Sequence, residues 1–267
     1  MLYLILVPIL VSLYVWYDRT ADQISQPDDL PQLDRPVVTL VLITICISIF
    51  VMQHFAFASR AAAIAMEYGS IPAVLTGRVP PDSELAALGF SRTHELLTLF
   101  TSAFLHGGFF HIFGNMIFLW VFGRHFDDLM NWYFYLALVV VCTLSSSLAS
   151  VIAEPARTTP TIGASGFIAG LMGAYLVLFP KAKLYQYWRV PLLMRPITFA
   201  LPAWAYLLVW MGLQITYFSM GGERKYSIAY SAHIVGFVTG AALAWMLNKA
   251  GAIASYAPEV AVGTKTS

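Results

Sequence analysis

Long apolar runs alternate with shorter polar connections along this chain of 267 residues. A membrane-spanning helix needs about 20 apolar residues, each rising about 1.5 Å along the axis. Six runs meet that length, over residues 37–57, 103–123, 132–152, 162–179, 197–218 and 229–248. The pattern predicts an all-α polytopic membrane protein.

The composition agrees with that prediction and excludes some other classes. Hydrophobic residues make up 59% of the chain and charged residues 11%, whereas a soluble domain carries roughly 25% charged residues. The net charge of +1 and the lack of a basic run argue against nucleic-acid binding. Cys46 and Cys142 both lie in apolar runs, which favours buried packing over a disulfide framework. The sequence has no CxxC or HExxH motif and no carboxylate cluster, so we expect no metal and no cofactor.

The segments outside the six runs differ in character. Residues 1–17 are apolar and end in aromatic residues, which predicts an added N-terminal span or an interfacial anchor. Residues 18–36 form a polar linker, and residues 249–267 form a loose tail. The connection at 58–102 is long but contains apolar residues and prolines, which is typical of a lid or a packed loop.

The distribution of positive charge predicts the orientation. Lys and Arg residues, counted on alternate sides of the spans, number nine on the side of the 180–196 loop and six on the other, which together make the 15 of the chain. By the positive-inside rule, that loop and the C-terminus are cytoplasmic and the 58–102 segment is outside. A compact chain without a transit peptide suggests a bacterial cytoplasmic membrane.

Hydroxyl, imidazole and amide groups occur inside the apolar runs, where they are costly and therefore indicate function. They are His106, His111 and Asn115 in the second run, Ser165 in the fourth and His233 in the sixth. These three runs cross the membrane in the same direction, so the groups fall in the outer half or near the midplane, with Ser165 and His233 at nearly equal depth. A serine nucleophile, a histidine base and donors for an oxyanion are the parts of a serine hydrolase.

Local spacing supports the same interpretation. His111 and Asn115 are four residues apart and share a helix face, whereas His106, followed by two glycines, is expected to bridge loop and helix. Ser165 lies in the first helical turn, where free backbone N–H groups can stabilise a negative charge.

Glycines near these groups have two predicted uses. Gly163 and Gly166 allow a tight turn and a close backbone approach around Ser165. Small residues at Gly166-x-x-x-Gly170 and Gly236-x-x-x-Gly240 let membrane helices pack closely. Because no Asp or Glu lies inside the spans to orient His233, we expect a Ser–His dyad rather than a triad.

Each of these residues also has an ordinary structural interpretation. Ser165 could be a packing residue, and His233 and Asn115 could each form a hydrogen bond between helices. The combination of residue types, runs and depth favours catalysis over these separate explanations.

The motifs resemble those of the rhomboid intramembrane serine proteases, over residues 37–248. The matching pieces are Arg35-Pro36, Leu96-Leu97-Thr98, Phe104 through Met116 with its His-Gly-x-x-x-His-x-x-x-Asn pattern, Gly163-Ala164-Ser165-Gly166 and Ala232-His233-Ile234-Val235-Gly236.

The resemblance implies a six-helix rhomboid bundle with an added N-terminal segment. It implies that Ser165 is the nucleophile, that His233 is the general base, and that His111, Asn115 and the backbone N–H of Ser165 form the oxyanion hole. Residues 58–102 would be a membrane-embedded first loop, and the fifth span with the 219–228 cap loop would gate lateral entry of substrate.

Two positions depart from the family pattern. Ala169 stands four residues after Ser165, where many bacterial members carry an aromatic residue that stacks on the base. Leu97-Thr98 replaces a Trp-Arg pair in the first loop. These changes bear on the positioning of His233 and on the anchoring of the loop, and leave the nucleophile in place.

The sequence therefore predicts a serine endopeptidase that cleaves single-span membrane proteins near the outer face of the bilayer. Its partners would be transmembrane substrates and lipid; the oligomeric state is open. One alternative is a non-catalytic rhomboid-like protein that binds membrane clients. Another is a transporter or channel, which the lack of an internal repeat disfavours.

Overall fold

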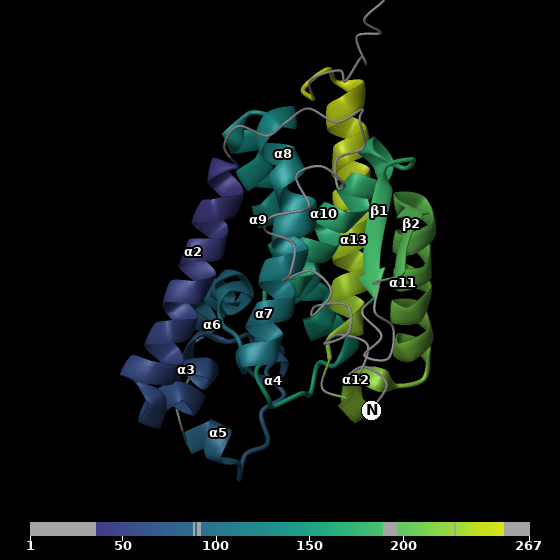
Figure 1. Cartoon of the computed structure of the whole chain (residues 1–267). Helices are drawn as coiled ribbons and strands as arrows, with labels where there is room; N and C mark the ends of the chain where they lie inside the picture. Colours follow the sequence, from purple (N-terminus) through teal and green to yellow (C-terminus); the bar gives the residue numbers. More distant parts are fainter. Residues whose placement is uncertain (1–35, 88, 90–91, 189–196, 227, 254–267) are drawn as a thin grey trace, which may run out of the picture.

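The computed structural model describes residues 36–87, 89, 92–188, 197–226 and 228–253. Its longer helices, such as α2, α9, α11 and α13, form a bundle with roughly parallel axes, in which α10 lies in the middle and α2 and α11 lie at opposite edges (Figure 1). The segment 1–17 and most of the predicted linker and tail lie outside the described residues.

The longer helices supply the bundle, and short elements connect them. The helices are α2 (Val37–Val51), α3 (Ala61–Tyr68), α4 (Pro72–Leu75), α5 (Glu84–Ala87), α6 (Arg92–Thr101), α7 (Phe109–Phe118), α8 (Arg124–Leu129), α9 (Trp132–Ala153), α10 (Ser165–Leu178), α11 (Ala203–Ser219), α12 (Gly222–Tyr226) and α13 (Tyr230–Lys249). Short 3₁₀ or π turns occupy η2 (Met52–Ala56), η3 (Ala58–Arg60), η4 (Ser102–Phe104) and η5 (Leu119–Gly123), and the strands are β1 (Lys183–Trp188) and β2 (Ile197–Pro202).

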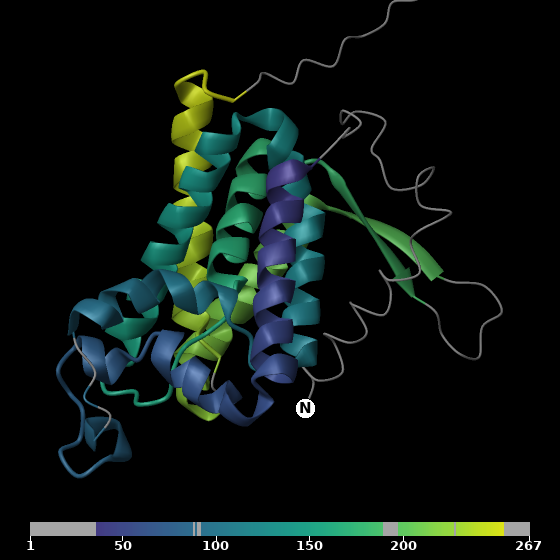
Figure 2. The same cartoon turned by 90° about the vertical axis from the view of Figure 1, so that its left-hand side faces the viewer.

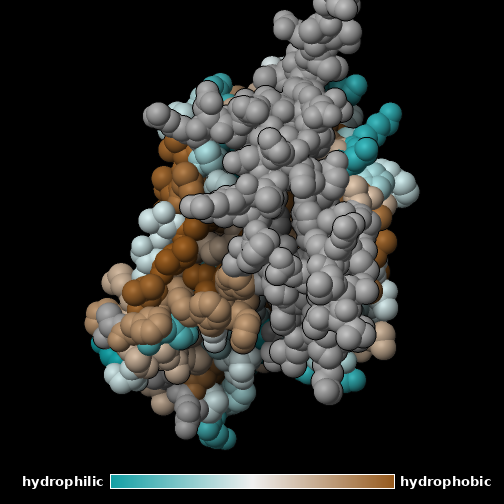
Figure 3. All heavy atoms as spheres, viewed as in Figure 1, coloured by the Kyte–Doolittle hydropathy of each residue, from teal (hydrophilic) through white to brown (hydrophobic). Residues whose placement is uncertain are grey.

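The predicted all-α polytopic membrane class is confirmed. Within the described residues, three helices are long and apolar enough to cross a membrane, over Val37–Phe55, Trp132–Ala153 and Tyr230–Lys249. A fourth candidate is a pair, Glu95–Phe104 and Phe109–Asp127, that bends by 80° at a short break. Large apolar side chains such as Val41, Leu148 and Val238 are exposed on the outside of the bundle, and Figure 3 shows such a surface on the side of α2. Lipid accounts for this exposure, which is unusual for a soluble protein.

The second predicted span, 103–123, begins later than expected. Its helix α7 starts at Phe109, and residues 105–108 form a connection after η4. The Gly107-Gly108 pair explains the break, because glycine loses more backbone entropy in a helix than any other residue. His106 consequently lies in the connection and not in the helix.

The fifth predicted span, 197–218, is wrong at its start, because residues 197–202 form strand β2 and helix α11 begins at Ala203. Strand β2 pairs antiparallel with β1, from Lys183 opposite Pro202 to Trp188 opposite Ile197, and the hairpin extends away from the bundle (Figure 2). Apolarity alone did not distinguish strand from helix here, whereas the β-branched residues and Pro202, which lacks an N–H, favour a strand that ends where the helix begins.

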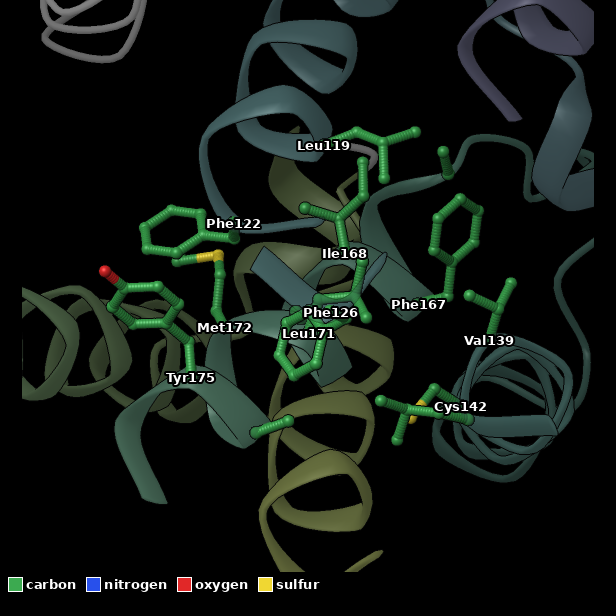
Figure 4. Packing of buried hydrophobic residues seen from close by; sticks show 14 of the residues in the cluster. Leu119, Phe122, Phe126, Val139, Cys142, Phe167, Ile168, Leu171, Met172 and Tyr175 are labelled. Carbon is green, nitrogen blue, oxygen red and sulfur yellow. The ribbon is translucent and has the colours of Figure 1, made fainter. Parts of the chain in front are cut away.

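The fourth span is a short helix enclosed by protein. Helix α10 has 14 residues, about 21 Å in length, which is less than the hydrocarbon thickness. All its residues from Gly166 to Tyr175 are buried. Figure 4 shows how the side chains of α10 meet those of neighbouring helices, with Phe122 and Tyr175 edge to face at 5.3 Å. A helix that other helices surround does not need to match the bilayer.

Glycines bring α10 and α13 into backbone contact. A Cβ at Gly236 would collide with the carbonyl oxygen of Gly166, and a Cβ at Gly240 would collide with the backbone of Gly170. A Cβ at Gly173 would meet the backbone of Phe237. We call these five glycines, Gly166, Gly170, Gly173, Gly236 and Gly240, the glycine seam. The seam holds the start of α10 beside the start of α13.

A carboxylate binds the start of α2, at the end of the bundle away from the start of α10. Asp127, on α8, accepts hydrogen bonds from the backbone N–H of Val38 at 2.6 Å and of Thr39 at 3.1 Å, and from the Thr39 hydroxyl at 2.7 Å. The Thr39 hydroxyl also bonds the Tyr135 hydroxyl at 3.0 Å, so α2, α8 and α9 share one network. A negative charge at a helix N-terminus satisfies its free N–H groups and its dipole.

The long 58–102 connection is largely ordered into α3, α4, α5 and α6, which gather at one end of the bundle (Figures 1 and 2). Cys46 and Cys142 are free and buried, as predicted.

Candidate active site

Ser165 and His233 are hydrogen-bonded to each other. Ser165 is the first residue of α10, and His233 lies in the first turn of α13. The Ser165 Oγ is 2.8 Å from the His233 Nε2, although 68 positions separate them in the sequence. Both residues are partly exposed, so the pair is not sealed completely inside the protein.

The chain before Ser165 is shaped by Gly163. Its φ angle is 121°, in the region that side chains rarely adopt, and its N–H donates to the Ser102 carbonyl at 2.9 Å. This turn directs the chain into α10, so Ser165 has a backbone N–H with no acceptor inside its own helix.

His111 and Asn115 lie beside this turn, on α7. An ideal Cβ at Gly163 would be 2.7 Å from two ring atoms of His111 and 3.6 Å from the Asn115 Nδ2. Asn115 is buried, and its Nδ2 has no hydrogen-bond partner among the described residues. A buried donor without a partner is costly unless something fills the place, so this amide is suited to receive a ligand oxygen.

His106 lies in the connection before α7, where it contacts His111. It is fully buried, and its ring meets the His111 ring edge-on at 5.2 Å between centroids. The His111 Nδ1 accepts from the Gly107 N–H at 3.4 Å, which links the two histidines through the connection before α7. His106 therefore supports the position of His111.

Gly166 and Gly236, predicted as structural neighbours of the site, belong to the glycine seam. A Cβ at Gly166 would also collide with the Ser146 side chain of α9. Close packing of three helices is thus what brings the ends of α10 and α13 together.

Gln214 was not predicted from the sequence as a site residue. It is hydrogen-bonded to the His233 ring at Nδ1, the nitrogen that does not face Ser165. It lies on α11, is 2% exposed, and its Oε1 is 2.8 Å from the His233 Nδ1. The expectation of a dyad rested on the lack of Asp and Glu inside the spans, whereas the group that faces His233 is an amide. A glutamine inside an apolar helix is the signal that could have found it, because a buried amide requires partners.

Aromatic rings of α11 and α13 surround the His233 imidazole. The Trp210 ring lies 6.0 Å from it and the Tyr230 ring 6.3 Å, between centroids. Ala169, where an aromatic neighbour was expected from the family pattern, is buried. Phe167 points into the core toward Val139 and does not replace that neighbour (Figure 4).

Charged residues fix the connection that precedes α13. Glu223, on α12, is buried and accepts the backbone N–H of Ser231 at 2.6 Å. Arg224 pairs with Glu154, at the end of α9, at 2.8 Å. Burial lowers the pKa of the Arg157 guanidinium, an effect that Glu223 and then Glu154 oppose. The Glu223 bond thus ties α12 to the start of α13, two residues before His233, and the Arg224 pair ties α12 to the end of α9.

The arrangement can activate a hydroxyl and bind a negative oxygen. A histidine nitrogen within hydrogen-bond reach of a serine can take its proton. His111 and Asn115 lie close to the Gly163 turn that leads into α10, and their side chains can donate to a negative oxygen. Among the described residues, no group of three His, Cys, Asp or Glu side chains could hold a metal ion.

Comparison with known proteins gives consistent matches. The Rhomboid domain family model matches residues 93–250, more than half of the chain. Rhomboid protein 1, mitochondrial, of Saccharomyces cerevisiae is 28% identical over 161 residues, which cover 58% of this chain and 42% of that protein. RHOMBOID-like protein 12, mitochondrial, of Arabidopsis thaliana is 29% identical over 171 residues, covering 58% of this chain and 47% of the relative.

RHOMBOID-like protein 5 of the same plant is 35% identical over 82 residues, which cover 31% of this chain and 26% of the relative. The matched regions thus cover less than half the length of each of these relatives. The family match covers the connection before α7 and the helices that carry Ser165 and His233, and on this basis the chain belongs to the rhomboid family.

Proposed function

We propose that this protein is an intramembrane serine endopeptidase in which Ser165 is the nucleophile and His233 the general base. The observation that carries the proposal is the 2.8 Å hydrogen bond between the Ser165 Oγ and the His233 Nε2. Membership of the rhomboid family supports intramembrane protease-type function, and the two polar groups lie at the ends of tightly packed helices.

The proposed reaction has two stages. The Ser165 oxygen attacks the peptide carbonyl carbon while its proton passes to the His233 Nε2. The tetrahedral intermediate collapses, the C–N bond breaks, and the leaving amine takes the proton from His233. Water then attacks the acyl-enzyme, again with His233 as the base, and releases the acid and the free serine.

The negative oxygen of the intermediate requires donors at fixed positions. The Asn115 Nδ2, the His111 ring and the Ser165 backbone N–H are the proposed donors. Support comes from the Asn115 Nδ2, which has no hydrogen-bond partner among the described residues, and from the closeness of both side chains to Gly163. Donors aimed at a developing oxyanion lower the barrier because they need no reorganisation during the reaction.

The proposed substrates are single-span membrane proteins, cleaved near the outer end of their helix. Peptide bonds in a helix are shielded, so helix-destabilising residues such as Gly or Pro near the cut favour cleavage.

The protein is an integral membrane protein. Its placement in a bacterial cytoplasmic membrane, with the C-terminus in the cytoplasm, stays a prediction, since two of the relatives are named mitochondrial.

Active-site labelling tests the proposal without a known substrate. The purified full chain is treated with a fluorophosphonate probe, and the adduct is mapped by mass spectrometry. We expect an adduct on Ser165 that is lost in Ser165→Ala and His233→Ala. A folded protein that gives no adduct, or labelling that persists in His233→Ala, contradicts the mechanism and favours a non-catalytic rhomboid-like protein that binds membrane clients.

A further inference from the structure

Gln214 is a polar residue on the buried, otherwise apolar face of α11. The buried residues of this helix form one stripe, Ala203, Leu207, Met211 and Gln214. Gln214 is the polar member of that stripe and lies at its end nearest to His233. Most buried amide groups have hydrogen-bond partners, and at 2% exposure Gln214 has one for its nitrogen and one for its oxygen.

The hydrogen bonds of Gln214 define its orientation. Its Nε2 donates to the Trp210 carbonyl one turn earlier, at 3.5 Å, and its Oε1 lies 2.8 Å from the His233 Nδ1. A carbonyl oxygen can only accept, so the His233 Nδ1 must carry the proton. The neutral ring then has its lone pair on Nε2, which is the atom that faces the Ser165 hydroxyl.

We propose that Gln214 is a positioning residue that completes a Ser–His–Gln relay. This inference rests on the proposed protease function. Gln214 holds the His233 ring in the tautomer and the direction in which Nε2 can take the serine proton. When His233 becomes an imidazolium, its Nδ1–H stays bonded to the amide oxygen, and the amide takes no proton. An amide that orients the histidine of a nucleophile–histidine pair is chemically sufficient for this role.

The relay also makes the position of the His233 ring depend on α11, a helix at the edge of the bundle (Figure 1). Trp204, Leu208 and Val209 of α11 are all at least half exposed, so the helix is held to the bundle along its one buried stripe. The glycine seam fixes Ser165 and His233 through α10 and α13, independently of α11. A displacement of α11 away from α13 would therefore remove the partner of Nδ1 and the neighbouring Trp210 ring, while the glycine seam keeps α10 beside α13.

Labelling kinetics of Ser165 with the fluorophosphonate probe test the role. Gln214→Met keeps the length and removes the acceptor, Gln214→Glu keeps an acceptor oxygen, and Met211→Leu is the control on the same stripe. A positioned base contributes roughly 10²- to 10⁴-fold, so we expect Gln214→Met to lower the maximal labelling rate roughly 10- to 100-fold. The half-saturating probe concentration should stay within about twofold. Gln214→Glu should retain most of the rate, and Met211→Leu all of it.

The outcomes separate the relay from simple packing. Equal losses in Gln214→Met and Gln214→Glu, or a maximal rate for Gln214→Met within about twofold of the unaltered chain, overturn the proposal. If the unaltered chain is not labelled at all, the proposed protease function fails instead. Thermal unfolding of each variant, measured beside Met211→Leu, shows whether a slower labelling rate comes from loss of folded protein.

A second measurement needs no Gln214 variant. The chain has six histidines, so ¹⁵N spectra of the unaltered protein and of His233→Ala identify the His233 signals by difference. We expect the tautomer with a protonated Nδ1 at neutral pH. A spectrum in which Nε2 carries the proton contradicts the relay, even if Gln214→Met does not fold.

Discussion

Gly163 and His111 fit together so closely that a single methyl group on the glycine would lie 2.7 Å from the Cε1 and Nε2 of the imidazole. The glycine also has a φ angle of 121°, which a side chain disfavours. The space before Ser165 is thus filled by a histidine from another helix, and the turn and the proposed oxyanion donor depend on one another.

Gly163→Ala is expected to impair both the turn and the site. The new Cβ must displace His111 or move the backbone away from its φ angle, so the probe-labelling rate of Ser165 should fall at least about tenfold. Overpacking and backbone strain each cost about 1–3 kcal/mol. Gly212→Ala, on α11 with nothing within 4 Å of an added Cβ, is the matched control. A Gly163→Ala protein as active and stable as that control would contradict the fit.

Asn115→Ala should affect the rate and not the fold. The Asn115 Nδ2 has no partner among the described residues, so its removal leaves no buried acceptor unsatisfied. Loss of one oxyanion donor lowers the rate by roughly 10²- to 10³-fold, while the unfolding temperature should change little. Asn131→Ala, which removes an exposed amide bonded to the Tyr133 hydroxyl at 3.0 Å, should keep full activity. Equal rates for the two variants would remove Asn115 from the oxyanion hole.

Gly240→Ala tests the glycine seam far from the chemistry. An added Cβ would collide with the Gly170 backbone, and a backbone cannot move aside as the end of a side chain can. We expect a loss of stability at or above the usual overpacking range of about 1–3 kcal/mol. Labelling of Ser165 should also fall, because α13 carries His233. Thermal unfolding and labelling measured on the same samples check this, and an unchanged labelling rate would show that the seam does not set the Ser165–His233 distance.

Two glutamates that bind near or within α12 should differ in how much they contribute to stability and to the labelling rate of Ser165. Glu223→Ala removes the buried acceptor of the Ser231 N–H, two residues before His233, and a lost helix cap costs about 0.5–2 kcal/mol. Glu154→Ala breaks an ion pair whose Arg224 side chain is 79% exposed, and such pairs contribute at most about 1 kcal/mol. We therefore expect lower stability and slower labelling for Glu223→Ala than for Glu154→Ala. The reverse order would mean that the ion pair, and not the cap, holds α12.

The sequence predicted the class of the fold and the ends of several helices, because membrane helices must satisfy their own backbone hydrogen bonds and therefore produce long apolar runs. The start of the fifth span was predicted wrongly for the same reason. Residues 197–202 are as apolar as the helix that follows, and their pairing with β1 depends on a partner outside the run.

The residues that meet at the site were predicted in part. Ser165, His111, Asn115 and His233 were selected because hydroxyl, imidazole and amide groups are rare in apolar runs. Gln214 belongs to the same class, but only the tertiary structure shows that its oxygen faces His233. The family pattern pointed to the position of Ala169 as the usual place for an aromatic ring, whereas the rings beside His233 come from α11 and α13.

The glycine seam has a consequence for how this protein could change over generations. Where side chains separate two helices, exchanging one for a slightly larger or smaller one shifts the helices by a fraction of an ångström. Backbones that already touch leave no such intermediate steps, since glycine is the smallest residue and alanine already collides. The spacing of α10 and α13 can thus be kept or lost but not adjusted in small steps, so gradual changes around Ser165 and His233 must arise in α11 and in the connections between helices.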